Sequence, residues 1–293
     1  PAIIEEFGLG YSPSNLNLLS RLKEKSFHPD LIRQSGLFSY SNDHTYERFQ
    51  DRLIFPIQDY QNRVVGFGGR ILDPLSKLAK YVNSEETNHF NKRKLLYGIE
   101  KAKSHISKQD AVLLMEGYVD VIIAHQFNFK NAIACMGTSL TEDQIKLIQR
   151  LTNKVYLVMD NDNAGKTSAE RSYVLLKQFE ITVYVIQMDK KDPADFLTTE
   201  GSEKFEALIN NAKPGFLYYL DRLFENHPSQ SIEDVAVIVN KAIEKLKLEK
   251  EPIILKHYAN ELAKRGKIEP NLIMAKLQQT VQLLSKVALM EKF

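Results

Sequence analysis

Between residues 111 and 186 the sequence alternates short apolar runs with segments of helical periodicity, and this alternation limits the fold more than any other feature. The apolar, β-rich runs are AVLLM (111–115), NAIACM (131–136), KVYLVM (154–159) and ITVYVI (181–186). Between them lie YVDVIIAHQF, LTEDQIKLIQRL and AGKTSAERSYVLLKQF, whose apolar residues recur with the spacing of a helix face. This order of strands and helices predicts a small parallel sheet covered on both faces.

The regions on either side of this alternation have different patterns. The segment DRLIFPIQDYQNRVVGFGGRIL predicts a hairpin that turns between Asp59 and Asn62. Its glycines predict a bulge or a close backbone approach. From residue 201 onward, amphipathic helix patterns are separated by Pro, Gly or His-Pro breaks, and one of them begins at the capping residue Ser231. We expect an α/β protein with a mixed α+β N-terminal subdomain (residues 1–107), a central parallel-sheet domain (108–200) and a C-terminal helical bundle (201–293).

Composition restricts the class of protein further. The chain has 293 residues, is 43% hydrophobic and has no apolar run of membrane-spanning length, which predicts a globular protein of two or three compact units with no membrane contact. Cys135 is the single cysteine, so neither a disulfide framework nor a cysteine zinc cluster can form. No signal peptide opens the chain, and we expect a cytoplasmic protein. Because the sequence starts abruptly in apolar residues, we expect the core of a longer protein.

The net charge of +2 conceals a segregation of charges along the chain. From Arg48 to Lys103 there are eleven Lys or Arg residues against six Asp or Glu, and from Lys108 to Glu200 there are ten against thirteen. A basic segment followed by an acidic one is expected where phosphates and metal ions meet. Ordinary solvated surface has the same appearance, so the counts alone leave both interpretations open.

The stretch VYLVMDNDNAGKTSAE resembles a phosphate-binding loop but fails the pattern. Such a loop needs a glycine where Asp160 stands, because its backbone must wrap a phosphate closely. The carboxylates of Asp160 and Asp162 would repel an anion unless a cation lay between them. The stretch therefore predicts a metal site, with Lys166 in the first helical turn as a candidate for a phosphate contact.

Acidic residues follow several of the predicted strands. Glu116 follows the first strand and Asp160 the third, Asp192 and Asp195 come shortly after the fourth, and Gly137 and Thr138 follow the second. In a parallel sheet these positions meet at the carboxyl edge, where open α/β sheets bind ligands. Oxygen ligands without Cys or His favour Mg²⁺ or Mn²⁺, which complete their shells with water and substrate phosphates. Each acid alone is common in loops, but their shared placement predicts a phosphoryl or nucleotidyl transfer site.

These residues also carry a resemblance to a known family. Glu116-Gly117-Tyr118-Val119-Asp120, followed by Asp160-Asn161-Asp162 and Asp192-Pro193, resembles the Toprim domain of bacterial primases, topoisomerases and some nucleases. The upstream motifs ERFQDRLIFPIQDYQNRVVGFGGR, KYVNSEET and FNKRKLLYG, and then ACMGTSLTEDQ, are similar to the RNA-polymerase core of the bacterial replicative primases of the DnaG type. The similarity extends from Phe7 to Tyr219.

The resemblance implies a DNA-directed RNA polymerase, a nucleotidyltransferase that makes short RNA primers on single-stranded DNA at the bacterial replication fork. It implies that two or more Mg²⁺ or Mn²⁺ ions act with the substrate and that Glu116 is also the acid/base residue. The implied metal ligands are Glu116, Asp160, Asp162 and Asp192, of which the first three are also implied to be catalytic. Asp195 departs in spacing from the family pattern, which leaves its role as a ligand open.

The resemblance assigns the basic segment to the nucleotide or template channel. The implied binding residues are Arg52, Arg70, Lys80, Tyr81, Asn83 and Lys92, with Ser84 and Thr87 as weaker candidates. Guanidinium groups such as those of Arg52 and Arg70 suit phosphate bidentately, and the Tyr81 ring could stack on a base. Surface charge on a β-rich subdomain is the alternative interpretation, particularly for Lys80 and Lys92.

The implied partners are single-stranded DNA, ribonucleoside triphosphates and the RNA primer, with the replicative helicase reached through a region absent from this chain. Guanosine tetra- and pentaphosphate are implied inhibitors, and we expect a monomer. The family's zinc module uses Cys and His, so we expect no zinc here and weak initiation of synthesis. Two alternatives stay open: a Toprim-type nuclease or topoisomerase fragment, and a non-enzymatic nucleotide-sensing module that would use Asp160 as a receiver aspartate near Lys166 or Thr138.

Overall fold

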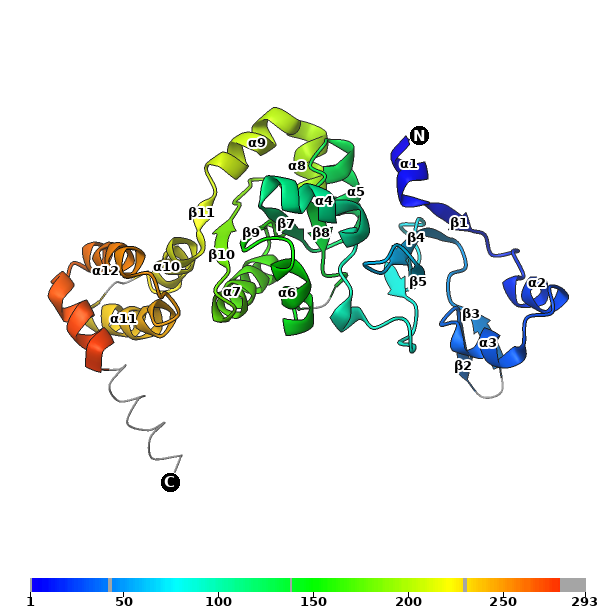
Figure 1. Ribbon diagram of the computed structural model, residues 1–293, viewed down its shortest axis with the longest axis horizontal. Coiled ribbons are helices and arrows are strands. Elements are labelled where there is room, and N and C mark those ends of the chain that lie inside the picture. The colour runs from blue at the N-terminus through cyan, green and yellow to red at the C-terminus, as the bar shows by residue number, and fades with distance from the viewer. Residues whose placement is uncertain (1, 42–43, 138, 229–230, 280–293) are drawn as a thin grey trace, which may run out of the picture.

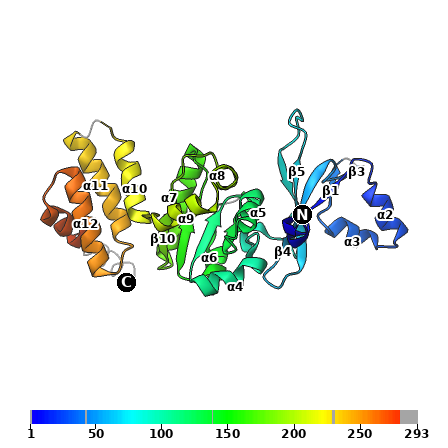
Figure 2. The ribbon, with the colours of Figure 1, turned by 90° about the horizontal axis from the view of Figure 1, so that it is seen from above.

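The computed structural model describes residues 2–41, 44–137, 139–228 and 231–279. The molecule is elongated and is built of three parts that follow the order of the chain (Figure 1). N-terminal strands and short helices lie at one end, a sheet with helices lies in the middle, and a group of helices lies at the other end, as the view from above also shows (Figure 2). The site described below lies where the first two of these parts meet.

The N-terminal part is built on an antiparallel sheet in the order β1-β4-β5-β6. Its strands are β1 (Gly10–Ser12), β4 (Arg52–Gln58), β5 (Val64–Ile71) and β6 (Tyr81–Asn83). The hairpin predicted from the sequence is confirmed as β4 and β5, and Asp59 Oδ1 shapes its turn by accepting the N–H groups of Gln61 and Arg63. The other elements are α1 (Ala2–Phe7), α2 (Leu18–Glu24), α3 (Pro29–Gln34), β2 (Phe38–Ser41), β3 (His44–Glu47) and a 3-10 turn, η1 (Lys92–Lys94).

The glycines of β5 allow aromatic rings to pack directly on the strand. A Cβ atom at Gly66 would lie 2.6 Å from the Phe90 ring, and one at Gly68 would lie 2.8 Å from the Tyr118 ring. The register between β4 and β5 also shifts between Ile57 and Gln58. Of the two alternatives predicted for this segment, the bulge is confirmed, and the predicted close approach of another strand's backbone is not what the glycines accommodate. The approaching groups are rings from other segments of the chain.

The central sheet has the order β11-β10-β9-β7-β8 and confirms the parallel arrangement predicted for its core. Its parallel strands are β7 (Val112–Met115), β8 (Ala132–Ala134), β9 (Lys154–Leu157) and β10 (Thr182–Val185). Alternate residues of β7 enter two separate apolar cores, Val112 and Leu114 in one and Leu113 and Met115 in the other. Both faces of the sheet are therefore covered. The short antiparallel edge strand β11 (Lys213–Pro214) was not predicted.

The helices around this sheet begin either at a glycine or at a polar cap that the sequence displays. They are α4 (Ile99–Gln109), α5 (Tyr118–Gln126), α6 (Glu142–Gln149), α7 (Asn163–Gln178), α8 (Pro193–Glu200) and α9 (Ser202–Asn210). Thr141 and Gln144 form the predicted capping box of α6. Asp162 caps α7 and Asp192 caps α8, each by accepting a backbone N–H. Two of the predicted metal ligands therefore also have a structural role.

Three further helices follow β11, namely α10 (Gly215–Glu225), α11 (Ile232–Leu246) and α12 (Pro252–Gly266). Ser231 caps α11 as predicted, and residues 270–279 are also helical. Apolar side chains such as Leu220, Ile238 and Leu262 join one core with Leu176 of α7. The end of the expected helical part, residues 280–293, lies outside the described residues. Within the described part, no helix combines the length and apolar character that crossing a membrane requires.

Candidate active site

A cavity of about 490 Å³ lies at the carboxyl edge of the central sheet, where the N-terminal sheet meets it. Among the residues predicted for the site, those that the structure brings to its walls are Arg70, Lys80, Tyr81, Asn83, Lys92, Glu116, Asp160 and Asp192. The acids come from the segments that follow β7, β9 and β10, and the basic residues come from β5 and the segments around β6. Cations and carboxylates from segments far apart in the sequence thus share one hollow.

The carboxylates of this cavity are close enough to perturb one another. The Asp160 backbone N–H donates to Glu116 Oε1 at 3.2 Å, which ties the end of β9 to the end of β7. Burial, together with Glu116 and Asp192, raises the pKa of Asp160 to about 6. Burial and the nearby Asp162 also raise the pKa of Glu116. Like charges held in a partly desolvated site are stabilised by a cation, so the cluster favours binding one.

Asp162 and Asp192 each use one carboxylate oxygen to cap a helix, and this limits how they could bind a metal ion. Asp162 Oδ1 accepts the Gly165 N–H at 2.7 Å, and Asp192 Oδ1 accepts the Asp195 N–H at 2.8 Å, which leaves the second oxygen of each outside the cap. Across the described ranges, no three His, Cys, Asp or Glu side chains converge into a ready-made metal cage. Oxygen donors of this kind fit Mg²⁺, which is usually held by one or two carboxylates with water and substrate phosphates.

Some predicted residues lie beside the cavity rather than on its walls. Asp162 does not line it but follows Asp160 closely, and Asp195 is exposed on α8 while Ala194 lines the cavity. Lys166 shares a smaller hollow of about 110 Å³ with Asp160, which extends toward Arg222 of α10. Thr138 lies outside the described residues. The phosphate contact predicted for Lys166 would therefore be made at a separate wall of the site.

Tyr81 and Asn83 on strand β6 present different chemistry to the cavity. The Tyr81 ring is 40% exposed, with the Arg70 guanidinium 5.6 Å and Lys80 Nζ 6.0 Å from its centroid. Tyr118 Oη donates to Asn83 Oδ1 at 2.5 Å. Because this bond occupies the Asn83 carbonyl oxygen, its amide nitrogen remains available as a donor. Strand β6 thus offers the ring face of Tyr81 and the amide donor of Asn83, and the cations of Arg70 and Lys80 lie beside the ring.

Arg52 has a different environment from the other predicted basic residues. It is 4% exposed, does not line the cavity, and its NH1 group donates to the Ala79 carbonyl at 2.9 Å. Longer contacts of 3.4 Å reach the carbonyls of Gly69 and Lys80. The geometry favours a role in positioning the Lys80 segment over the direct phosphate contact that the sequence suggested.

The two weaker candidates on this side have local partners. Ser84 Oγ accepts the Phe67 N–H, and Thr87 Oγ1 accepts the Phe90 N–H. Both hydroxyls are engaged in holding backbone, which indicates structural roles.

Two residues of the cavity were missed by the sequence analysis. Asp120 belongs to the quoted motif but was given no role, although a helix that starts after Glu116 returns the fourth residue toward the strand end. Burial, together with Asp160 and Asp192, raises its pKa to about 7. Lys191 lines the cavity and acts in the opposite sense, because its charge lowers the pKa of Asp160. No motif in the sequence indicated Lys191.

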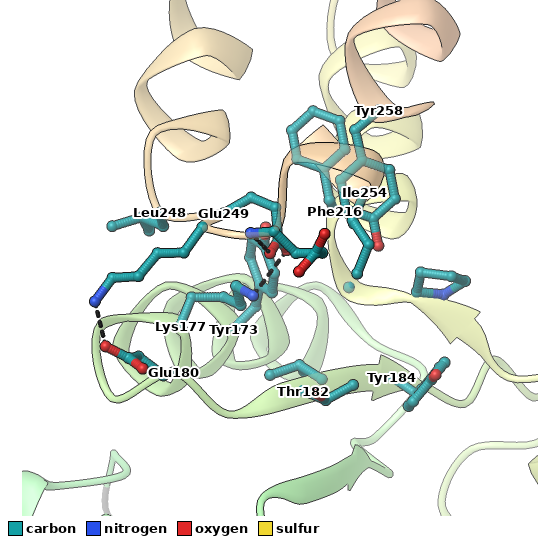
Figure 3. A pocket seen from close by; sticks show the side chains of 15 residues that line it. Tyr173, Lys177, Glu180, Thr182, Tyr184, Phe216, Leu248, Glu249, Ile254 and Tyr258 are labelled. Carbon is teal, nitrogen blue, oxygen red and sulfur yellow. Dashed lines mark hydrogen bonds and ion pairs between the residues drawn. The ribbon is translucent and has the colours of Figure 1, made fainter. Parts of the chain in front are cut away.

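A second cavity, of about 380 Å³, lies between the central domain and the C-terminal helices (Figure 3). Its walls carry aromatic rings from four elements, Tyr173, Tyr184, Phe216 and Tyr258. The ion pair between Lys177 and Glu249 crosses it at 2.9 Å, and Lys250 pairs with Glu180 at its rim. None of the predicted site residues lines it, and its lysines are already neutralised. We therefore place the chemistry at the first cavity.

Comparisons with known proteins agree with this placement. Residues 1–103 match the family model of the DNA primase catalytic core, N-terminal domain, and residues 113–197 match a Toprim-like model. A DNA primase of Clostridium acetobutylicum is 34% identical over 290 residues, which is 97% of this chain and 48% of that protein. A DNA primase of Borreliella burgdorferi is 35% identical over 90% of this chain and 51% of its own length. The chain thus spans about half the length of these relatives.

Solved structures give the same assignment over most of both chains. A DNA primase domain from Pseudomonas aeruginosa superposes with a TM-score of 0.79 at 28% identity, covering 95% of this chain and 88% of that one. A DnaG primase catalytic domain bound to single-stranded DNA has a TM-score of 0.79 at 30% identity, covering 92% of this chain and 86% of its own. Taken with the paired family matches, this similarity shows that the chain belongs to the DnaG primase family and corresponds to its catalytic core.

Proposed function

We propose that this chain synthesises short RNA primers on single-stranded DNA by metal-dependent nucleotidyl transfer. The observation that carries the proposal is the pairing, in one cavity, of carboxylates with Arg70, Lys80 and Lys92. A nucleoside triphosphate bound with divalent cations is complementary to this arrangement, since its phosphates match the basic wall and its cations the acidic one. The single-stranded DNA in the similar DnaG structure supports a DNA template.

Each side of the cavity has a proposed role. Glu116 accepts the proton of the attacking hydroxyl, and its raised pKa suits proton transfer nearer neutral pH. Together with Glu116, the carboxylates of Asp160, Asp162 and Asp192 would hold Mg²⁺ or Mn²⁺, with two or more ions present when substrate is bound. Bound at these carboxylates, such ions would lower the pKa of the attacking hydroxyl and stabilise charge on the leaving pyrophosphate. The basic residues bind triphosphate and template backbone, and Tyr81 stacks on a base.

The setting of this activity is also proposed. We assign residues 1–107, 108–200 and 201–293 to a nucleotide- and template-binding subdomain, a Toprim domain and a helical bundle. The boundary between the two family matches supports the first division. We place the protein as a monomer at the replication fork in the bacterial cytoplasm, without zinc in this region. It would contact its helicase through parts of the protein outside this chain.

Guanosine tetra- and pentaphosphate are proposed inhibitors of this same site. The support is the basic wall, where Arg70, Lys80 and Lys92 could receive either a triphosphate or an alarmone. A labelled alarmone should be displaced by GTP, and Arg70→Ala and Lys80→Ala should weaken its binding. Alarmone binding that survives both substitutions would remove this part of the proposal.

The experiment that tests the function uses homopolymeric DNA templates with labelled ribonucleotides and Mg²⁺ or Mn²⁺. The proposal predicts incorporation of the complementary nucleotide only, with yield that depends on the template. Cleavage of the DNA without synthesis would favour a Toprim nuclease. Nucleotide binding with neither reaction would favour a sensing module.

A further inference from the structure

Two adjoining hollows lie between α7 and the segment that follows β8, and one of them is lined by Glu116. Their volumes are about 210 and 300 Å³, and they share Ser139, Leu140, Ser168 and Ser172. The smaller one also shares Glu116 and Gly137 with the candidate active site. We name these two hollows the hydroxyl groove. The Glu116 carboxylate therefore borders the hydroxyl groove as well as the candidate active site.

The lining of the hydroxyl groove is chemically distinct from that of the main cavity. Ser172 lies in both hollows and is only 5% exposed, yet its hydroxyl has no hydrogen-bond partner among the described residues. Arg171 lines the larger hollow, and it forms no ion pair with another described residue. Among the described residues of the lining, Glu116 is the only acid. Ser172 therefore brings to the groove a hydroxyl that can donate to and accept from a ligand.

The chemistry of the groove narrows the class of ligand. One arginine and several hydroxyl groups suit a ligand with a single phosphate charge and hydroxyl groups of its own. Leu140 and Leu175 provide apolar contact beside them. A triphosphate or pyrophosphate carries more charge than one arginine neutralises, and the main cavity offers such groups Arg70, Lys80 and Lys92. The groove therefore fits a nucleotide within a ribonucleic acid strand.

We propose that the hydroxyl groove binds the 3′-terminal ribonucleotide of the growing primer, with Arg171 on its phosphate and Ser172 and Ser168 on its ribose hydroxyl groups. This inference rests on the proposed function, because nucleotidyl transfer must bring a 3′-hydroxyl and a triphosphate together at one point. Glu116 borders both recesses and is placed to take the proton of that hydroxyl. Attack of the 3′-oxygen on the α-phosphorus forms the new phosphodiester bond and releases pyrophosphate.

Single-nucleotide extension of an RNA primer annealed to a DNA template tests the proposal. The KM values for the primer-template and for the incoming nucleotide are measured separately for the wild type, Arg171→Ala and Ser172→Ala. Arg171→Ala should raise the primer KM about tenfold, as expected for loss of a charge-assisted hydrogen bond, and leave the nucleotide KM within twofold. Arg150→Ala is the matched control, since Arg150 is also exposed and lines none of these hollows. An unchanged primer KM in both groove variants would overturn the assignment.

A second comparison addresses the ribose contact. A primer that ends in a 2′-deoxynucleotide should extend less efficiently than a fully ribonucleotide primer, because it lacks a hydroxyl group that can donate and accept. Ser172→Ala should reduce this preference, while Arg171→Ala should leave it in place. A preference that is the same in the wild type and in Ser172→Ala would contradict the role given to Ser172.

A binding measurement separates failure of this inference from failure of the proposed function. Fluorescence anisotropy of a labelled RNA primer on DNA, without nucleotide, requires no catalysis. If the wild type incorporates nothing, the proposed function fails. The groove assignment then stands only if Arg171→Ala weakens primer binding and Arg150→Ala does not. Equal binding by the wild type and Arg171→Ala would overturn the groove assignment, whether or not the chain is active.

Discussion

Replacing Tyr118 by phenylalanine removes one hydroxyl group at the joint between the Toprim domain and the N-terminal sheet. The ring itself would stay in place, because it stacks on Phe55 at 5.1 Å and meets Tyr97 edge-on at 4.7 Å. What is lost is the 2.5 Å hydrogen bond to Asn83 Oδ1. Asn83 would then lose the group that fixes its amide toward the cavity.

The expected magnitudes follow from this bond. A hydrogen bond of this kind contributes about 1 kcal/mol to stability, and because Asn83 lines the cavity, water can partner its Oδ1 in the variant and the cost stays near this value. Tyr97→Phe is a matched control, because the Tyr97 hydroxyl is buried and has no hydrogen-bond partner among the described residues. Removing it should leave the free energy of unfolding unchanged or raise it by about 1 kcal/mol.

Urea unfolding of the two variants measures the stability difference, and nucleotide incorporation measures the effect on the site. We expect Tyr118→Phe to raise the KM for the nucleotide about three- to tenfold, and Tyr97→Phe to leave it unchanged. Equal destabilisation by the two substitutions, or an unaffected KM in Tyr118→Phe, would refute the reasoning.

Three further predictions concern stability. Burial lowers the pKa of His125 to about 4, below the value of about 6.5 in an unfolded chain, so the unfolded state binds more protons between these values. Stability should be complete above pH 6.5 and fall by up to about 3 kcal/mol toward pH 4. Urea unfolding should show a smaller fall in His125→Gln. In thermal unfolding, Gly68→Ala should cost about 1–3 kcal/mol because its Cβ meets the Tyr118 ring, whereas Gly10→Ala meets nothing within 4 Å. Asp162→Asn should keep the cap of α7, whereas Asp162→Ala should lose about 1 kcal/mol in urea unfolding, and both should lose metal-dependent incorporation.

The parts of the fold that follow local rules were predicted from the sequence. The parallel strands follow from short apolar runs, the hairpin from its alternation and turn, and the start of α6 from Thr141 and Gln144. Because strand ends meet at one edge, the convergence of Glu116, Asp160 and Asp192 could also be predicted. The edge strand β11 was missed, since two residues carry no periodicity.

The parts of the site that depend on tertiary contacts were not predicted. A guanidinium in the sequence does not reveal whether it faces a ligand or, like Arg52, backbone carbonyls. Lys191 belongs to no motif and reaches the cavity only because the segment after β10 returns to the sheet edge. The groove beside α7 likewise depends on how Ser172 packs against the segment after β8. These contacts can be identified only when the three-dimensional structure is known.

The central claim is that carboxylates at the sheet edge support metal-dependent nucleotidyl transfer. The most direct test compares ribonucleotide incorporation on single-stranded DNA by the wild type, Asp160→Ala and Asp143→Ala, with folding checked by circular dichroism. Asp143 is an exposed acid of α6 that lines none of the cavities described above. Incorporation should persist in Asp143→Ala and disappear in a folded Asp160→Ala at every Mg²⁺ concentration. Wild-type incorporation by Asp160→Ala would contradict the account.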